Sequence, residues 1–223
     1  MSHPDTCVVI PVFNEDQVIA GVVDEVLATF DHVVCVDDGS SDQTYAVLAK
    51  TGARIVRHPT NLGQGAALQT GIEYALADPA VRSIVTYDAD GQHRVDDASR
   101  MVDLLATEDV DIVFGSRFLD ERTEVGWAKR AVLKAAVRYT NASTGVKLSD
   151  AHNGLRAFDR AVAERLDIRM NGMAHASEIV STVAKAGFRY TETPVHIVYT
   201  EYSKAKGQSL LNSVNIVFDL LFR

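Results

Sequence analysis

The feature that most constrains this chain is a regular alternation between short apolar runs and amphipathic segments in its first half. The apolar runs are rich in β-branched residues and predict strands at 6–12, 32–37, 53–57, 83–88 and 111–115. Their near-continuous apolar character is typical of strands buried on both faces, as in a parallel sheet. Apolar residues recur at helical spacing between them, over 17–30, 43–50, 64–77 and 96–106. This alternation predicts an open α/β sheet covered by helices.

A polar loop follows each of these five predicted strands. In chain order the loops read PVFNE, DDGSSD, HPTNLGQG, DADGQH and GSRF. Ligands of open α/β sheets bind outside the carboxyl ends of the strands. The sequence therefore predicts a binding site at this edge of the sheet.

Two carboxylates crowd the end of the fourth predicted strand. Asp88 and Asp90 are two positions apart, so in extended chain both side chains point the same way while Ala89 turns toward the core. Paired carboxylates are ligands that Mg²⁺ or Mn²⁺ accepts, and Gln92 could add an amide oxygen. The spacing is consistent with a metal site.

Two plainer interpretations remain open for these acidic stretches. The loop after the fourth strand could serve only to cap the next helix, with Asp96 or Asp97 as the N-cap. The segment Asp37–Ser40 could be only a turn, with Asp42 capping the helix that follows.

Composition excludes several classes of protein. The 223 residues form an ordinary globular composition, 47% hydrophobic and 23% charged, and we expect one domain. A net charge of −8 argues against nucleic-acid binding. The N-terminal stretch has no basic region before a long apolar run, so we expect a cytoplasmic protein with reduced, buried Cys7 and Cys35. The stretch GQGAAL lacks the third glycine of a dinucleotide motif, and no P-loop motif is present.

The second half is less regular. It predicts a helix at 125–140 in which Arg130, Lys134 and Arg138 form a basic stripe at i, i+4 and i+8. Further along it predicts a strand at 153–159, helices at 160–167 and 176–186, and one or two strands within 189–199.

The C-terminal segment 209–222 predicts a short helix with one broad apolar face. Its length of about 21 Å is too short for a bilayer core of about 30 Å. Three contacts remain open for it: the domain itself, a second copy of the chain or a membrane-protein partner, or the lipid interface. The basic stripe would add attraction to anionic lipid.

Taken together, these motifs resemble the family 2 glycosyltransferases of the glycosyltransferase A fold. The resemblance rests on VVIPVFNE, VDDGSSD, NLGQGAALQTGI, YDADGQH (the family's DXD motif), GSRF, DAHNGLRAF and YSKAKGQS, in that order along the chain. It implies one glycosyltransferase domain with a nucleotide-sugar-binding half (1–117) and an acceptor half (118–223). The donor would be a UDP- or GDP-linked sugar.

The resemblance also implies roles for individual residues. Those expected to bind the nucleotide sugar are Pro11, Phe13, Glu15, Asp37, Asp38, Asn61, Gly63, Gly65, Asp88 and Ala89. Among them, the glycines would let the backbone approach the nucleotide closely. The cation, Mg²⁺ or Mn²⁺, would be held by Asp88, Asp90 and Gln92, and would neutralise the departing nucleoside diphosphate.

The acceptor implied by the resemblance is polyprenyl phosphate, as in the dolichyl-phosphate mannosyltransferase-like branch. Enzymes that act on hydroxyls usually carry two acids near positions 149–150, and here only Asp150 is acidic. A phosphate monoester is already largely ionised and needs cations rather than a base. Arg117, Arg156 and Lys204 are the candidate cations, and Asp90, Arg117, Asp150 and Lys204 the candidate catalytic residues.

The implied product is a precursor of cell-envelope or polysaccharide glycans, made by an inverting enzyme in the cytoplasm. A peripheral position on the inner face of the membrane stays open. One alternative is transfer to a sugar hydroxyl, with Asp150 or Glu178 as the base. Another is a non-catalytic scaffold that binds the nucleotide sugar, although a scaffold would be expected to have lost the DXD motif.

Overall fold

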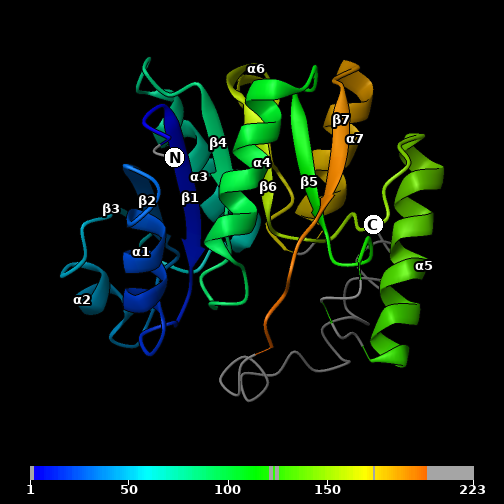
Figure 1. The fold of residues 1–223 in the computed structure, drawn as a ribbon. Helices are drawn as coiled ribbons and strands as arrows, with labels where there is room; N and C mark the ends of the chain where they lie inside the picture. Colours follow the sequence, from blue (N-terminus) through cyan, green and yellow to red (C-terminus); the bar gives the residue numbers. More distant parts are fainter. Residues whose placement is uncertain (1–2, 121–122, 124–125, 173, 200–223) are drawn as a thin grey trace.

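A single seven-stranded sheet organises the chain (Figure 1). The computed structural model describes residues 3–120, 123, 126–172 and 174–199. Within them the strands are β1 (Thr6–Val12), β2 (His32–Asp37), β3 (Arg54–Arg57), β4 (Ser83–Thr86), β5 (Ile112–Ser116), β6 (Arg156–Asp159) and β7 (Tyr190–Pro194). Their order across the sheet is β3-β2-β1-β4-β6-β5-β7.

The sheet is mostly parallel, as predicted. Strands β3, β2, β1 and β4 run parallel to their neighbours, and β7 runs parallel to β5. The exception is β6, which pairs antiparallel with both β4 and β5. Because β6 separates β4 from β5, the second half of the chain contributes a strand to the middle of the sheet.

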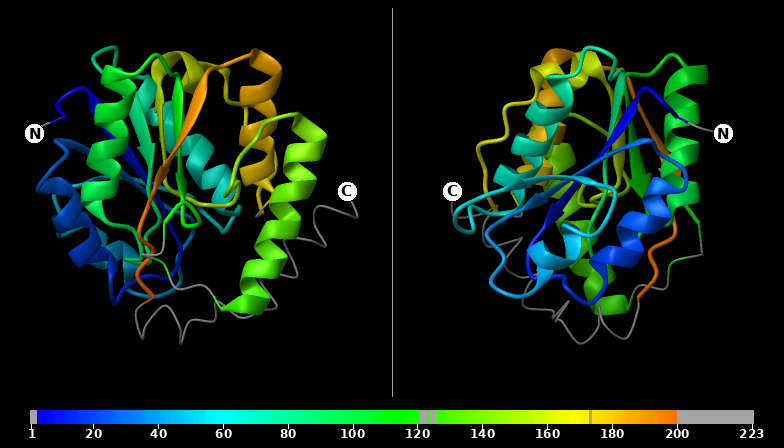
Figure 2. Two further views of the ribbon diagram at one scale, coloured as in Figure 1. Left: turned by 45° about the vertical axis from the view of Figure 1, so that its right-hand side comes forward. Right: turned by 90° about the vertical axis from the view of Figure 1, so that its left-hand side faces the viewer.

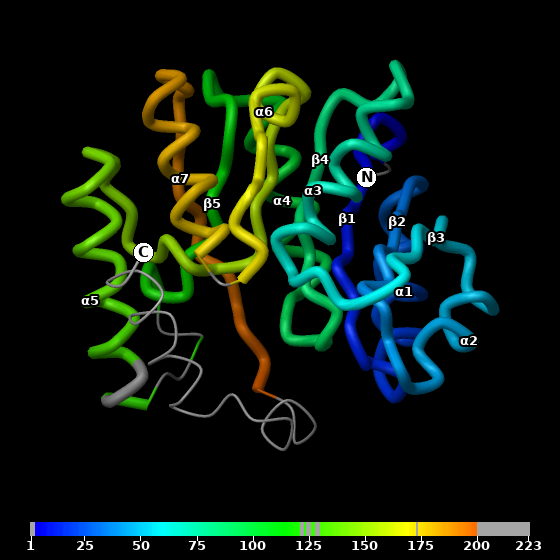
Figure 3. Tube along the Cα trace, turned by 180° about the vertical axis from the view of Figure 1, so that it is seen from behind, coloured from blue at the N-terminus to red at the C-terminus, as the bar shows by residue number. Residues whose placement is uncertain are grey.

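Helices cover both faces of the sheet (Figures 1 and 3). The helices are α1 (Ile19–Leu27), α2 (Thr44–Leu48), α3 (Gln64–Leu76), α4 (Val95–Thr107), α5 (Trp127–Thr144), α6 (Arg160–Arg165) and α7 (His175–Ala186). Apolar residues of α1 and α4 form the core on one face, and those of α3, α6 and α7 form it on the other. Both layers agree with the predicted amphipathic segments.

Helix α5 stands at the edge of the molecule beyond β7 (Figure 2). It buries Leu133, Ala136, Val137 and Thr140, which recur at helical spacing, and it ends at Gly145 in the left-handed conformation. No helix in the described part of the chain is long and apolar enough to cross a membrane.

The structure corrects two local predictions around the acidic motif. Strand β4 ends at Thr86, so Asp88 follows in irregular chain and Asp90 lies in a turn. The assumption of extended chain through both carboxylates was therefore wrong. Neither Asp96 nor Asp97 is the N-cap of α4, because both lie within its first turn.

One further prediction needs revision. Strand β3 lies at the sheet edge and is only partly buried, not covered on both faces. The prediction of one or two strands within 189–199 is confirmed by one strand, Tyr190–Pro194. The motif YSKAKGQS and the predicted helix 209–222 lie outside the described residues.

Candidate functional site

The loops after β1 and β2 are tied to each other. Asn14 has φ of 53°, a left-handed conformation that no other non-glycine residue in the described part of the chain adopts. Its N–H donates to Ser40 Oγ (2.9 Å), and its Oδ1 accepts the N–H of Ser41 (2.9 Å). The N–H of Glu15 donates to Thr44 Oγ1 (2.8 Å). These bonds fix the loop that carries the expected nucleotide contacts of β1.

Two of those expected contacts differ in exposure. Phe13 is 43% exposed, so its ring is available to a ligand, whereas Glu15 is buried. Pro11 lies within β1 and is partly buried.

Asp38 holds the loop that connects β3 to α3. Its Oδ1 accepts from His58 Nδ1 (2.7 Å) and from the N–H of Leu62 (2.9 Å), and its Oδ2 accepts from the N–H of Gly63 (2.8 Å). The other ring nitrogen of His58 contacts Thr70 Oγ1 of α3 (3.0 Å). A change at Asp38 would therefore act on a ligand through the position of residues 62–63.

Asp37 is also engaged within the protein. Its Oδ2 lies 3.0 Å from Arg57 Nε, and its Oδ1 accepts the N–H of Ser40 (3.0 Å). Asp42 accepts the N–H of Thr44 (2.9 Å) at the start of α2. The contacts of Asp37 match the turn interpretation, which is compatible with a site at the edge of this segment, but the N-cap of α2 is Gln43 and not Asp42.

Gly63 and Gly65 lie against protein backbone. A Cβ at Gly63 would overlap the carbonyl oxygen of Asn171, and one at Gly65 would overlap that of Met170. The N–H of Gly65 donates to the carbonyl of Asn171 (3.0 Å). Both glycines therefore permit a close approach between the start of α3 and residues 170–171, while Asn61 is exposed.

Asp88 is held from several sides. Its Oδ2 contacts His93 Nε2 (2.9 Å), and its Oδ1 accepts from Gln64 Nε2 (3.2 Å). The backbone of Gly154 lies so close that a Cβ there would overlap the carboxylate. Burial opposes the charge of Asp88, but the hydrogen bond with His93 and the nearby guanidinium of Arg156 hold its pKa below the usual value.

The pKa of Asp90 shifts in the opposite direction to that of Asp88. Burial and then the negative charge of Asp88 raise the pKa of Asp90 to about 6, and Glu15 adds to the effect. Three carboxylates from the loops after β1 and β4 thus repel one another. Ala89 between the two aspartates is buried in the core, as the sequence predicted.

Gln92 closes the same loop. Its N–H donates to Asp90 Oδ1 (3.1 Å), and its carbonyl accepts from the N–H of Val198 (2.9 Å). Its side chain is buried, with no hydrogen-bond partner for Nε2 among the described residues. The contact of its amide oxygen with a cation stays a prediction.

The acidic pair fits a hard divalent cation. Carboxylate oxygens are preferred ligands of Mg²⁺ and Mn²⁺, and a cation would relieve the repulsion that raises the pKa of Asp90. Among the described residues, no group of three His, Cys, Asp or Glu is arranged to hold a metal ion alone. A cation at Asp88 and Asp90 would therefore share oxygen atoms with a ligand such as a diphosphate.

A buried arginine lies close to Asp88. Arg156 is 1% exposed, and burial lowers its pKa to about 10. Its Nε and Nη1 have no hydrogen-bond partner among the described residues, and the same holds for both ring nitrogens of His152 and for Asn153 Nδ2. Buried donors are normally paired, so this group of donors fits an anionic ligand.

The sequence analysis did not identify His152 or Asn153. Both belong to the stretch DAHNGLRAF, where several polar residues precede a short apolar strand. That local excess of polar residues was the signal available for them. Burial lowers the pKa of His152 to about 4, so this imidazole is neutral at neutral pH.

Arg117 and Asp150 form a buried ion pair. Arg117 Nε lies 2.5 Å from Asp150 Oδ2, and Asp150 is 1% exposed. Burial works against the charge of Arg117, but the Asp150 carboxylate outweighs it and raises the pKa of Arg117. The carboxylate of Glu192 accepts from the N–H of Ser149 (2.8 Å) and from that of Asp150 (3.2 Å). Glu192 therefore fixes the turn that carries Asp150.

Of the two remaining candidates, Glu178 and Lys204, the structure describes only Glu178. Glu178 Oε2 accepts the N–H groups of Arg169 (3.0 Å) and Met170 (2.9 Å), so it holds a turn. Lys204 lies outside the described residues. Since Arg156 interacts electrostatically with Asp88, Asp150 and Arg117, it links the acidic pair to the Arg117–Asp150 pair.

Comparison with known proteins gives a consistent result. The family model described as glycosyl transferase family 2 matches residues 7–167. A UDP-N-acetylglucosamine–dolichyl-phosphate N-acetylglucosaminyltransferase of Methanococcus voltae is 28% identical, over 96% of this chain and 93% of the relative. A polyprenol monophosphomannose synthase of Mycolicibacterium smegmatis is 32% identical, over 95% of this chain and 82% of the relative.

Solved structures show the same fold. Glucosyl-3-phosphoglycerate synthase from Mycobacterium tuberculosis, crystallised with Mn²⁺, UDP and phosphoglyceric acid, is 19% identical with a TM-score of 0.71. The match covers 98% of this chain and 78% of that chain. At this identity the likeness concerns the fold alone, which is the glycosyltransferase A type.

Proposed function

The chain belongs to glycosyl transferase family 2 and is a glycosyltransferase, and on this premise we propose that it moves a sugar from a nucleoside-diphosphate sugar to polyprenyl phosphate. The observation that carries the proposal is the acidic pair Asp88–Asp90 next to the buried donors of Arg156. The acidic pair suits a cation bound to a diphosphate, and the donors of Arg156 suit a second anion. The names of the relatives from M. voltae and M. smegmatis support the lipid-phosphate acceptor.

On the donor side, Asp88, Asp90 and Gln92 would hold Mg²⁺ or Mn²⁺. When bound, the cation neutralises charge that develops on the departing diphosphate. The exposed ring of Phe13 and the loop fixed by Asp38 would bound the nucleotide. UDP is favoured over GDP, because UDP appears in the name of the M. voltae relative.

On the acceptor side, a phosphate oxygen would attack the anomeric carbon from the face opposite the diphosphate. The new carbon–oxygen bond forms as the bond to the diphosphate breaks, which inverts the configuration. Since a phosphate monoester has a second pKa near 6, no protein group needs to remove a proton. Arg117 and Arg156 would hold its charge, and Lys204 stays a candidate for the same role.

Transfer to a sugar hydroxyl is less well supported. A hydroxyl needs a base within reach. Asp150 is buried and paired with Arg117, and Glu178 is bonded to the backbone at residues 169–170. Both candidate bases are therefore engaged in other contacts.

The proposal is tested by incubating the purified protein with Mn²⁺ and a panel of UDP- and GDP-linked sugars. The acceptors are undecaprenyl phosphate in detergent and, separately, free sugars, with products identified by mass spectrometry. We expect a glycosylated polyprenyl phosphate from wild type and from the surface control Asp103→Asn, and none from Asp88→Asn. Products on free sugars alone would overturn the lipid-phosphate acceptor, and nucleotide binding without any product would favour a scaffold.

A further inference from the structure

Helix α5 has an unusual charge for this protein. The whole chain carries 30 acidic against 22 basic residues, yet the eighteen residues of α5 include four basic residues and no acidic one. A concentration of one charge on a single element of an oppositely charged protein indicates a local binding surface.

Three of these four basic residues, Arg130, Lys134 and Arg138, lie on one exposed stripe. Trp127, Lys134 and Arg138 stand at i, i+7 and i+11 on the helix, so they share one face, with Arg130 beside them. All four side chains are exposed. We call this set (Trp127, Arg130, Lys134 and Arg138) the α5 stripe.

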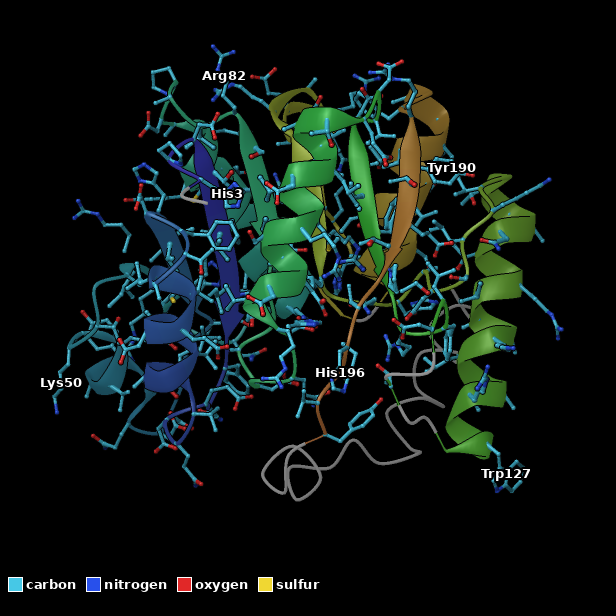
Figure 4. The ribbon with its side chains drawn as sticks, viewed as in Figure 1. His3, Lys50, Arg82, Trp127, Tyr190 and His196 are labelled. Atoms are coloured by element: carbon cyan, nitrogen blue, oxygen red, sulfur yellow. The ribbon has the colours of Figure 1, made fainter. Side chains whose placement is uncertain are left out.

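An aromatic anchor lies at one end of the stripe. Trp127 is 86% exposed and is the only tryptophan of the chain. In Figure 4 its side chain projects from the first turn of α5, away from the sheet. A large exposed indole beside lysine and arginine is the composition of a helix that lies at a membrane interface.

The stripe is connected to the candidate acceptor site. The guanidinium of Arg130 lies 5.7 Å from the centre of the Phe118 ring, and that of Arg117 lies 6.0 Å from the same ring. Phe118 thus stands between the first turn of α5 and the Arg117–Asp150 pair. A surface bound at the α5 stripe would lie beside the proposed phosphate-binding arginines.

We propose that the α5 stripe docks the protein on an anionic lipid surface. Trp127 enters the headgroup region, and Arg130, Lys134 and Arg138 lie over the lipid phosphates. The choice of lipid rests on the proposed function, because a polyprenyl phosphate is embedded in a bilayer with its phosphate at the surface. Docking there presents that phosphate to Arg117.

The single tryptophan makes this contact directly measurable. The full chain is mixed with vesicles of phosphatidylcholine and phosphatidylglycerol, or of phosphatidylcholine alone, and the emission of Trp127 is recorded with brominated lipids as quenchers. We expect a blue shift and quenching on the anionic vesicles, both reduced by salt. Each basic residue near an anionic surface strengthens binding about five-fold.

Charge variants locate the contact. Lys134→Gln/Arg138→Gln should weaken vesicle binding by at least about twenty-five-fold. The matched control is Lys50→Gln/Arg82→Gln, two exposed basic residues far from α5 in Figure 4, which should bind like wild type. Circular dichroism is used to check that both double variants are folded. Equal binding of the two variants, or no change in Trp127 emission, overturns the proposal.

A failure of vesicle binding can be distinguished from a failure of the proposed function. Transfer is measured in parallel with undecaprenyl phosphate dissolved in detergent, where docking on a bilayer is not required. Transfer in detergent without vesicle binding by wild type contradicts the α5 stripe alone. Stripe-dependent vesicle binding without transfer supports the surface and contradicts the acceptor.

Discussion

At the scale of single residues, Asp88 and Asp90 show how two chemically identical side chains acquire different pKa values. Contact with His93 and the nearby Arg156 favour the ionised form of Asp88. Burial and then the negative charge of Asp88 raise the pKa of Asp90, Glu15 adds to this, and His93 offsets only part of it. The site therefore holds one stable carboxylate and one that gains most from an added cation.

This difference predicts that Asp90→Asn stabilises the metal-free protein. The substitution removes like-charge repulsion, so the free energy of unfolding should rise by about 1–3 kcal/mol at neutral pH. Thermal unfolding in the presence of a chelator measures it. Mn²⁺ with UDP should raise the melting temperature of wild type and of the control Asp103→Asn, but not that of Asp90→Asn. Equal stabilisation of all three by Mn²⁺ would contradict a metal role for Asp90.

At the scale of elements, the segment from Ser149 to β6 joins the two parts of the site. It begins at the turn fixed by Glu192, carries the Asp150 partner of Arg117, and continues with the backbone of Gly154 against Asp88. Changes in this segment should therefore affect donor and acceptor separately, according to which end they touch.

At the β6 end, Gly154→Ala should reduce transfer strongly and lower stability. The added Cβ would push the Asp88 carboxylate away from its contacts with His93 and Gln64. We expect transfer to fall at least about a hundredfold, in line with the cost of displacing a reacting group by about 1 Å. Gly126→Ala, where a Cβ meets nothing within 4 Å, is the control. Full activity in Gly154→Ala would show that the Asp88 position is not critical.

At the other end, Glu192→Gln should weaken acceptor binding. The amide keeps the shape but loses one of the acceptor oxygens that fix Ser149 and Asp150, so Arg117 loses a well-placed partner. A charged hydrogen bond contributes about 1.5–3 kcal/mol, so the KM for polyprenyl phosphate should rise about ten- to a hundredfold. The KM for the donor should stay unchanged. Glu108→Gln, on the surface, controls for charge, and a parallel rise in both KM values would indicate general unfolding instead.

At the scale of the whole molecule, two buried histidines make stability depend on pH. Burial lowers the pKa of His152 and of His175 to about 4, below the unfolded value near 6.5. At these two histidines the unfolded chain therefore binds more protons between these pKa values, so their contribution to stability falls as pH drops below about 6.5.

The contribution of a single histidine to the pH dependence of the free energy of unfolding can be measured. Lowering the pH from about 7.5 to about 5 should cost about 2 kcal/mol for a histidine that stays neutral in the fold. Urea unfolding of wild type and His175→Asn at both pH values isolates the share of His175. The exposed His32→Asn should retain the full pH dependence of wild type. An identical pH dependence in His175→Asn would show that His175 is not neutral in the folded protein.

Local pattern predicted the first half of the fold closely, because runs such as TCVVIPV and HVVCVD indicate strands without reference to their partners. It could not predict that β6 inserts between β4 and β5, since the four residues RAFD do not encode which strands they pair with. For the same reason, the pairing of Arg117 with Asp150, 33 positions away, was visible only in three dimensions.

Because β6 lies between β4 and β5, the sheet stays incomplete during synthesis until β6 has been translated. Strand β4 can pair with β1 once both have left the ribosome, but the partners of Ile84 and Val85 on its other edge, Phe158 and Ala157, are translated only later. A nascent chain that ends before β6 thus displays an apolar strand edge, which is a template for association with other chains. Translation of β6 is therefore what protects the free edge of β4, and a ribosome pause between β5 and β6 would extend the interval in which a chaperone is needed.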